Sequence, residues 1–129
     1  MQVNRPLSIA IAITMSRVTQ CPFAIRSGGH SDVPGASNVE GGVTIDMSRL
    51  NEVTVSRDQK SVYIGAGAKW GDVYQTLDAL ELSVIGGRAA SVGVGGLTLG
   101  GGIIQSRVGA VDVVLLMTSC RRNVVSFRS

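Results

Sequence analysis

Two glycine-rich segments hold the residues that could carry chemistry. The first spans residues 26–31, RSGGHS, and contains His30, the only histidine of the 129-residue chain. Adjacent glycines allow positive φ angles and let another group approach the backbone closely. Successive N–H groups in such a turn form a concave site for an anion such as phosphate. The segment therefore predicts a phosphate-binding loop with an imidazole at its edge.

The second segment spans residues 92–102, VGVGGLTLGGG, and six of the ten residues from 93 to 102 are glycine. Each glycine costs about 0.5–1 kcal/mol in a regular helix or strand. We therefore expect no ordinary helix or strand core here, but a backbone that lies flat against a bound cofactor.

Familiar phosphate-binding motifs do not occur. The dinucleotide pattern G-x-G-x-x-G fails twice, because Trp70 and Thr98 stand where the third glycine would be. The P-loop pattern fails because Trp70 follows Lys69. The prediction of a phosphate site therefore depends on the two glycine segments acting together.

Metal sites and catalytic triads are not indicated by the sequence. One histidine and two distant cysteines, Cys21 and Cys120, offer no zinc ligand set. No nucleophile–histidine–carboxylate triad is expected either. Asp46 and Asp72 fit the end of a strand and the start of a helix better than an acid–base pair.

Charge is distributed unevenly along the chain. Residues 1–104 hold eight basic and eight acidic residues, whereas residues 105–129 hold four arginines and one aspartate, which supply the net charge of +3. A basic tail without a basic face does not indicate a nucleic-acid partner. We expect no membrane partner, since no apolar run reaches the ~20 residues that span a bilayer. The short run 7–15 lacks a signal-peptide cleavage site, and the compartment stays open.

The elements that must position these segments mix helix and strand patterns, which favours an α+β fold. Residues 8–20 fit either a strand or a helical face. Strands are expected over 22–25, 43–47, 61–67 and 83–85, with 50–55 and 61–67 forming a hairpin. We expect a surface connection over 32–42. A helix is expected over 70–81, with Trp70 and Tyr74 packed in the core.

A family resemblance joins these segments. The RSGGHS loop, IDMSRLN at 45–51, VYIGAGAKWGDVY at 62–74 and the second glycine segment resemble the vanillyl-alcohol oxidase and p-cresol methylhydroxylase (PCMH) superfamily. The nearest branch is that of the berberine-bridge-enzyme-like FAD-linked oxidases, and the resemblance covers roughly residues 16–104. It implies a helix over 8–20 and an incomplete α+β PCMH-type FAD-binding domain, with FAD between two small α/β subdomains.

The resemblance also implies a cofactor site. FAD would be held at its diphosphate by both glycine segments, and His30 would be joined covalently to the 8α-methyl of the isoalloxazine. Some members add a cysteine link three residues before the V-G-V-G-G run, where this chain has Ala89, so attachment is expected at His30 only. The implied cofactor-binding residues are Arg26, Ser27, Gly28, Gly29, His30, Ser31, Val92, Gly93, Gly95, Gly96, Thr98, Gly100, Gly101 and Gly102.

The resemblance stops soon after the second glycine segment. We therefore divide the chain into a partial FAD-binding domain, residues 1–104, and a divergent tail, residues 105–129, in which 111–117 could still pair as a strand. The expected function is the FAD-binding portion of a flavin-dependent oxidoreductase that oxidises C–H bonds of an alcohol, sugar or secondary metabolite, with O₂ as acceptor. The alternative is a non-catalytic FAD-binding remnant, because the family's substrate domain, which holds its catalytic base, has no counterpart in this sequence.

Overall fold

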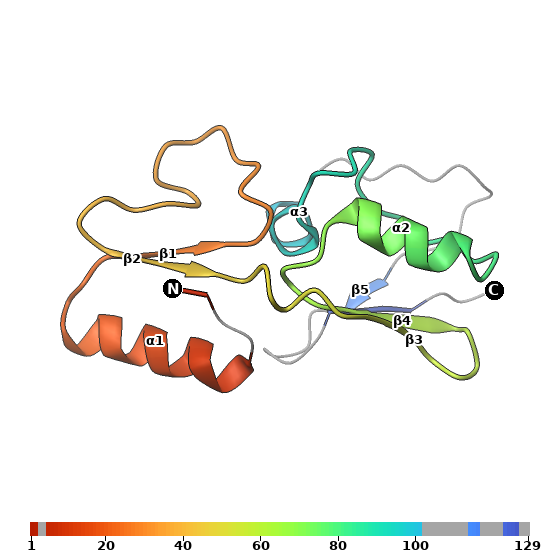
Figure 1. Ribbon diagram of the computed structural model, residues 1–129, viewed down its shortest axis with the longest axis horizontal. Helices are drawn as coiled ribbons and strands as arrows, with labels where there is room; N and C mark the ends of the chain where they lie inside the picture. The colour runs from red at the N-terminus through yellow and green to blue at the C-terminus, as the bar shows by residue number, and fades with distance from the viewer. Residues whose placement is uncertain (3–4, 102–113, 117–122, 127–129) are drawn as a thin grey trace.

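The computed structural model describes residues 1–2, 5–101, 114–116 and 123–126 (Figure 1). This part of the chain mixes helices and strands, which confirms the expected α+β class. The elements are α1 (Pro6–Val18), β1 (Phe23–Arg26), β2 (Val43–Asp46), β3 (Val53–Val55), β4 (Ser61–Ile64), α2 (Trp70–Asp78), α3 (Val94–Gly100), β5 (Val114–Leu116) and β6 (Asn123–Ser126). The strands form two sheets, and each sheet is the base of one lobe.

The first lobe is built on β1 and β2, which pair in parallel with Ile25 opposite Ile45. Helix α1 packs on one side of this pair, where Ala12, Ile45 and Met47 are buried together. Residues 27–42 pass on the other side (Figure 1). Parallel neighbours need such a crossover because both strands run in the same direction. The crossover begins with the first glycine segment, which therefore lies at the carboxyl end of β1.

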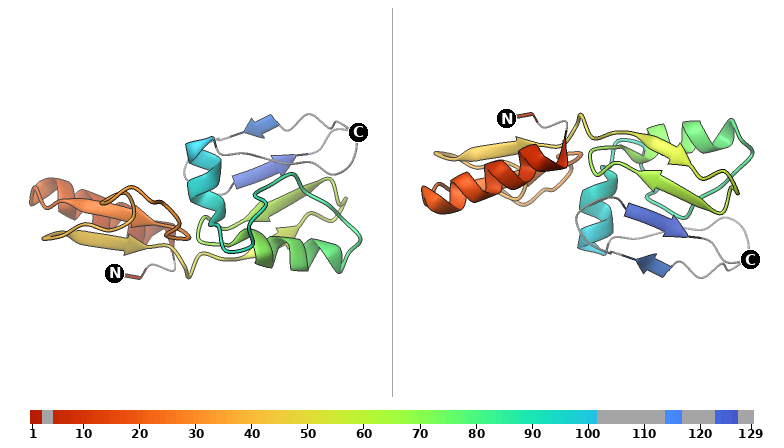
Figure 2. Two further views of the ribbon diagram at one scale, coloured as in Figure 1. Left: turned by 90° about the horizontal axis from the view of Figure 1, so that it is seen from above. Right: turned by 90° about the horizontal axis from the view of Figure 1, so that it is seen from below.

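The second lobe is built on β4, which lies between β3 and β6 in an antiparallel sheet of order β3–β4–β6–β5. Helix α2 lies along the β3–β4 hairpin (Figure 2). Five side chains from β4 and α2 form the centre of the core, namely Val62, Ile64, Trp70, Val73 and Leu77. Buried and half-buried residues alternate along β4, as in a strand with one covered face.

Most element types expected from the sequence are confirmed, with shifted ends. The helix expected over 8–20 begins at Pro6, where a proline loses no hydrogen bond because the first N–H groups of a helix have no partner within it. The helix expected over 70–81 ends at Asp78, so Leu80 lies beyond it and is exposed. The connection over 32–42 is mostly exposed, as expected.

The strand expected over 83–85 is wrong. These residues have no regular secondary structure. Packing holds them instead, because Val84 is buried in the second core and Gly86 lies against the ring of Trp70.

The expectation of an irregular second glycine segment is also wrong, because the segment contains α3. Val94 is buried at 1 % exposure, and its N–H donates to the Ala68 carbonyl at 2.9 Å. Leu97 packs against the same core. Packing supplies most of the stability of a helix in a protein, so these contacts outweigh the poor helix propensity of glycine. Gly101 ends the helix with a φ of +61°.

Candidate functional site

The two glycine segments touch through their backbones. A β-carbon added to Gly28 would overlap with the nitrogen of Gly93 and lie 2.7 Å from its Cα. One added to Gly93 would overlap with the nitrogen of Gly28 and lie 2.8 Å from its Cα. Only glycine fits at these two positions, so the fold itself requires glycine here in order to bring the segments together.

Ser27 links the first segment to the second lobe. Its hydroxyl donates to the carbonyl of Ala66, in the turn after β4, at 2.6 Å. The same hydroxyl would lie 3.3 Å from a β-carbon on Gly95, so α3 passes close to Ser27. Ser27 and Gly95 thus contact other parts of the protein. Sequence reasoning gave no signal for the role of Ala66.

Gly29 and His30 lie on the accessible side of this junction. Both are exposed, and Gly29 has a φ of +65°, which favours glycine. Among the residues that the structure describes, the N–H groups of Gly28, Gly29, His30 and Ser31 find no acceptor. Successive free N–H groups beside an imidazole are suited to an anion such as a diphosphate.

Other residues of the second segment have different surroundings. An added β-carbon meets no atom within 4 Å at three of its glycines, Gly96, Gly100 and Gly101. These backbone positions leave space for an incoming group. Thr98 is half-buried, and the Val92 carbonyl accepts a hydrogen bond at 3.0 Å from the start of α2. Gly102 lies outside the described residues.

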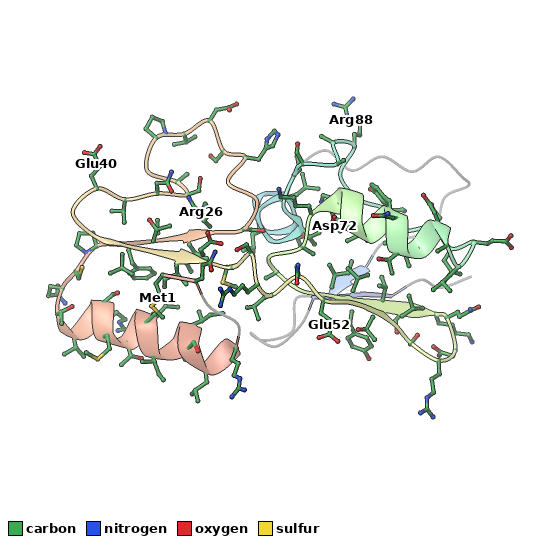
Figure 3. The ribbon with its side chains drawn as sticks, viewed as in Figure 1. Met1, Arg26, Glu40, Glu52, Asp72 and Arg88 are labelled. Atoms are coloured by element: carbon green, nitrogen blue, oxygen red, sulfur yellow. The ribbon has the colours of Figure 1, made fainter. Side chains whose placement is uncertain are left out.

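Arg26 lies at the end of β1 and forms hydrogen bonds with two other side chains. Its own side chain extends toward the crossover (Figure 3). Its Nη2 donates to Asp46 Oδ2 at 2.7 Å, and its Nη1 donates to Asn38 Oδ1 at 3.0 Å. Asp46 Oδ1 also accepts the Ser48 N–H at 2.9 Å. These bonds, with that from Arg26 foremost, lower the pKa of Asp46 to about 2. Sequence reasoning missed Asn38, whose only signal was the turn composition of residues 32–42.

The aromatic pair of α2 packs as expected. The rings of Trp70 and Tyr74 are stacked with centroids 5.8 Å apart. The Tyr74 hydroxyl donates to the Gly87 carbonyl at 2.8 Å, and burial raises the pKa of Tyr74. The pair therefore fixes the chain two residues before Ala89.

Metal-binding clusters and membrane-spanning helices are both absent from the residues that the structure describes. No group of three or more His, Cys, Asp or Glu side chains there could hold a metal ion. Within that part of the chain, none of the helices has the length and apolarity needed to cross a membrane.

The sequence matches a known protein family. A family model described as FAD binding domain matches residues 2–120. The chain belongs to this FAD-binding family. The match includes both glycine segments and runs past residue 104, while the division of the chain at that residue stays a prediction.

The FAD-binding domain has relatives of known name. It is 52 % identical over 101 residues to an FAD-dependent monooxygenase of Cochliobolus heterostrophus, covering 78 % of this chain and 20 % of that protein. A glucooligosaccharide oxidase from Acremonium strictum, described with a 6-S-cysteinyl, 8α-N1-histidyl FAD, is 26 % identical with a TM-score of 0.66, covering 77 % and 21 % of the two chains. A berberine-bridge-enzyme-like protein of Physcomitrella patens, with 21 % identity, a TM-score of 0.68 and coverage of 76 % and 22 %, shares the fold.

These likenesses confirm that the described residues form part of a PCMH-type fold. The berberine-bridge-enzyme-like protein of Physcomitrella patens shares this fold. The family is one of flavin-dependent oxidoreductases, and FAD is its cofactor. The chain spans about a fifth of the length of the curated relatives it matches.

Proposed function

We propose that this domain binds FAD where residues 26–31 meet residues 92–102. It would serve a flavin-dependent oxidoreductase that oxidises a C–H bond of an alcohol, a sugar or a secondary metabolite, with O₂ as acceptor. The observation that carries the proposal is the backbone contact between Gly28 and Gly93. This contact joins the loop that carries the exposed His30 to the helix that carries Gly96, around which there is open space.

The protein's own groups would bind and orient the cofactor. The free N–H groups of residues 28–31 would neutralise the diphosphate without a lysine or arginine. The open backbone at Gly96, Gly100 and Gly101 would let the cofactor lie close to α3 and its C-terminal end. Bound FAD would supply the acceptor for the hydride of the substrate.

We also propose His30 as the single covalent anchor of the flavin. Its imidazole is exposed at the edge of the free N–H groups. Ala89 stands where some members of the family have a cysteine, and alanine cannot form that link. The histidyl and cysteinyl links of the Acremonium strictum oxidase support this kind of attachment in the family.

An alternative function is FAD binding without turnover by this chain. The same site carries it, because the free N–H groups of residues 28–31 would bind the diphosphate whether or not a substrate is oxidised. An oxidase assay with alcohols and sugars separates the two functions. Flavin reduction by any such substrate would support the oxidoreductase, and FAD binding with no reduction would support the alternative.

Retention of FAD by the purified chain is the first test of the site. After incubation with FAD and gel filtration, we expect a flavin absorption spectrum in the protein fraction. Gly29→Leu should abolish it, because its β-carbon would lie 3.2 Å from Arg26 Cδ and displace the loop that carries the free N–H groups. Gly41→Leu is a matched control, since Gly41 also has a φ of +65° and lies in the crossover outside both segments. Equal retention by the two variants would contradict the proposed site.

The covalent anchor has a separate test. Acid precipitation of the flavin-loaded protein should leave the yellow colour in the pellet, and His30→Ala should release the colour into the supernatant. Colour that stays in the pellet of the His30→Ala protein would exclude His30 as the anchor.

A further inference from the structure

Three side chains outside the free N–H groups form a bonded cluster behind the His30 loop. Arg26 ends β1, Asp46 ends β2, and the two residues are paired in the register of the parallel strands. Asn38 belongs to the crossover that connects these strands. The guanidinium of Arg26 bonds to both, at 2.7 Å to Asp46 and at 3.0 Å to Asn38. One cation thus connects both strand ends to the far part of the crossover.

Asp46 is itself held firmly. One carboxylate oxygen accepts from Arg26, and the other accepts the backbone N–H of Ser48. The Asp46 side chain is 15 % exposed, whereas that of Arg26 is 38 % exposed. The low pKa of Asp46, which follows from these same bonds, keeps its carboxylate charged near neutral pH. Asp46 is therefore a fixed point from which Arg26 is oriented.

The first glycine segment folds over the stem of Arg26. A β-carbon on Gly29 would lie 3.2 Å from Arg26 Cδ and 3.6 Å from its Cγ. Gly29 has a positive φ at this point, and His30 follows at once. The position of the Arg26 stem therefore limits where Gly29 and His30 can lie.

We propose that Arg26, Asp46 and Asn38 form a clasp that positions His30 for attachment of the flavin. Asp46 and Asn38, which belong to neither glycine segment, are then positioning residues. Arg26 orients the loop in addition to supplying a positive charge. The inference rests on the proposed function in so far as it concerns the flavin. Lysine cannot replace arginine in the clasp, because an ammonium lacks the planar fork that reaches two partners in fixed directions.

The first experiment needs no cofactor. Backbone ¹⁵N relaxation of the FAD-free chain should give order parameters near 0.85 for Gly29 and His30, and below about 0.6 for Asn38→Leu and Arg26→Lys. Asn38→Asp keeps an acceptor for Arg26 and should retain the rigid loop. Asn51→Leu is the matched control, because Asn51 is also an exposed loop asparagine. Unchanged order in Asn38→Leu and Arg26→Lys would overturn the clasp.

The second experiment follows the flavin in the same proteins. We expect covalent attachment to be about 100-fold slower in Asn38→Leu than in the wild type, because a displacement of about 1 Å at a reacting group costs that much in rate. Attachment should be restored in Asn38→Asp, while the dissociation constant for non-covalent FAD changes less than threefold. An equal loss in both Asn38 variants, or a loss of affinity in place of rate, would overturn the positioning role. If the wild type takes up no FAD at all, the proposed function fails, and the order parameters still decide whether the clasp exists.

Discussion

At the scale of single residues, Asp46 makes the stability of the protein vary with pH in the acid range. Its pKa is about 2 in the folded protein against 3.8 for an unperturbed carboxyl. The lower value means that ionised Asp46 stabilises the fold above about pH 4, and that this stabilisation is lost as the pH falls through 2. Between about pH 5 and pH 2, the free energy of unfolding should fall by about 2 kcal/mol more in the wild type than in Asp46→Asn. Urea unfolding at a series of pH values measures this difference.

The control for this measurement is Asp78→Asn. Asp78 is an exposed aspartate at the end of α2, so its replacement makes the same change from carboxyl to amide away from Arg26. Parallel curves for the wild type and Asp46→Asn would mean that the bond from Arg26 contributes no net stability.

Two single residues also show the limit of sequence reasoning. His30 stands out because it is the only histidine and follows two glycines. Asn38 does not stand out, because its bond to Arg26 spans the crossover and depends on how the loop returns to β1. Local composition predicts that residues 32–42 are exposed, but not which of their side chains meets a cation.

At the scale of elements, two glycines at the N-terminal end of α3 have opposite requirements. Gly93, at its N-terminal end, lies against the backbone of Gly28, whereas Gly96 has open space around it. We expect Gly93→Ala to lower the free energy of unfolding by at least ~2 kcal/mol through overpacking. Gly96→Ala should raise it by about 0.5–1 kcal/mol, because alanine is the better helix former. Denaturant unfolding of the FAD-free chain compares the two variants directly.

The same pair of variants tests the location of the cofactor. If the open side of α3 faces FAD, Gly96→Ala should weaken FAD binding even though it stabilises the protein. A Gly96→Ala protein that is more stable and binds FAD as tightly as the wild type would place the cofactor elsewhere.

Elements with a strong local pattern could be predicted, and elements fixed by distant contacts could not. The helix at α2 repeats buried residues at Trp70, Val73 and Leu77, a spacing that the sequence displays. Helix α3 forms because Val94 and Leu97 meet a core assembled from other parts of the chain. The segment 83–85 is apolar like a strand, but packing under Trp70 replaces strand pairing. In both errors, tertiary contacts overrode a local preference.

At the scale of the whole molecule, α1 presents an apolar surface to solvent. Its outward side carries four exposed residues at helical spacing, Leu7, Ile11, Met15 and Val18. Its inward side buries Ala12 and Ser16. Exposed apolar surface of this kind promotes association, so we expect the isolated chain to exceed the monomer mass in light scattering. The double variant Ile11→Lys, Met15→Lys should shift it toward the monomer.

The matched control is Leu80→Lys, which changes an exposed leucine outside this surface. It should leave the measured mass near that of the wild type. An equal shift in both proteins would indicate a general effect of added charge.

The tail contributes strands to the second lobe. Strand β6 pairs with β4, with Val125 opposite Val62, and β5 pairs with β6. Val125→Pro removes a donor from the ladder and should speed amide exchange in β4 as well as in β6. Hydrogen exchange followed by mass spectrometry measures both strands. Unchanged protection in β4 would support a separate tail after residue 104, and reduced protection would assign the tail to the domain.

The contact between Gly28 and Gly93 also bears on the order of events in folding. It closes a much longer loop of chain than the α1–β2, β1–β2 or β3–β4 contacts do, and closing a longer loop costs more entropy. The contact should therefore form after the transition state, when those contacts already exist. In stopped-flow measurements, Gly93→Ala should then accelerate unfolding and leave the refolding rate nearly unchanged. On this view the cofactor site would be completed late in folding and opened early in unfolding, so bound FAD would slow the unfolding of the chain.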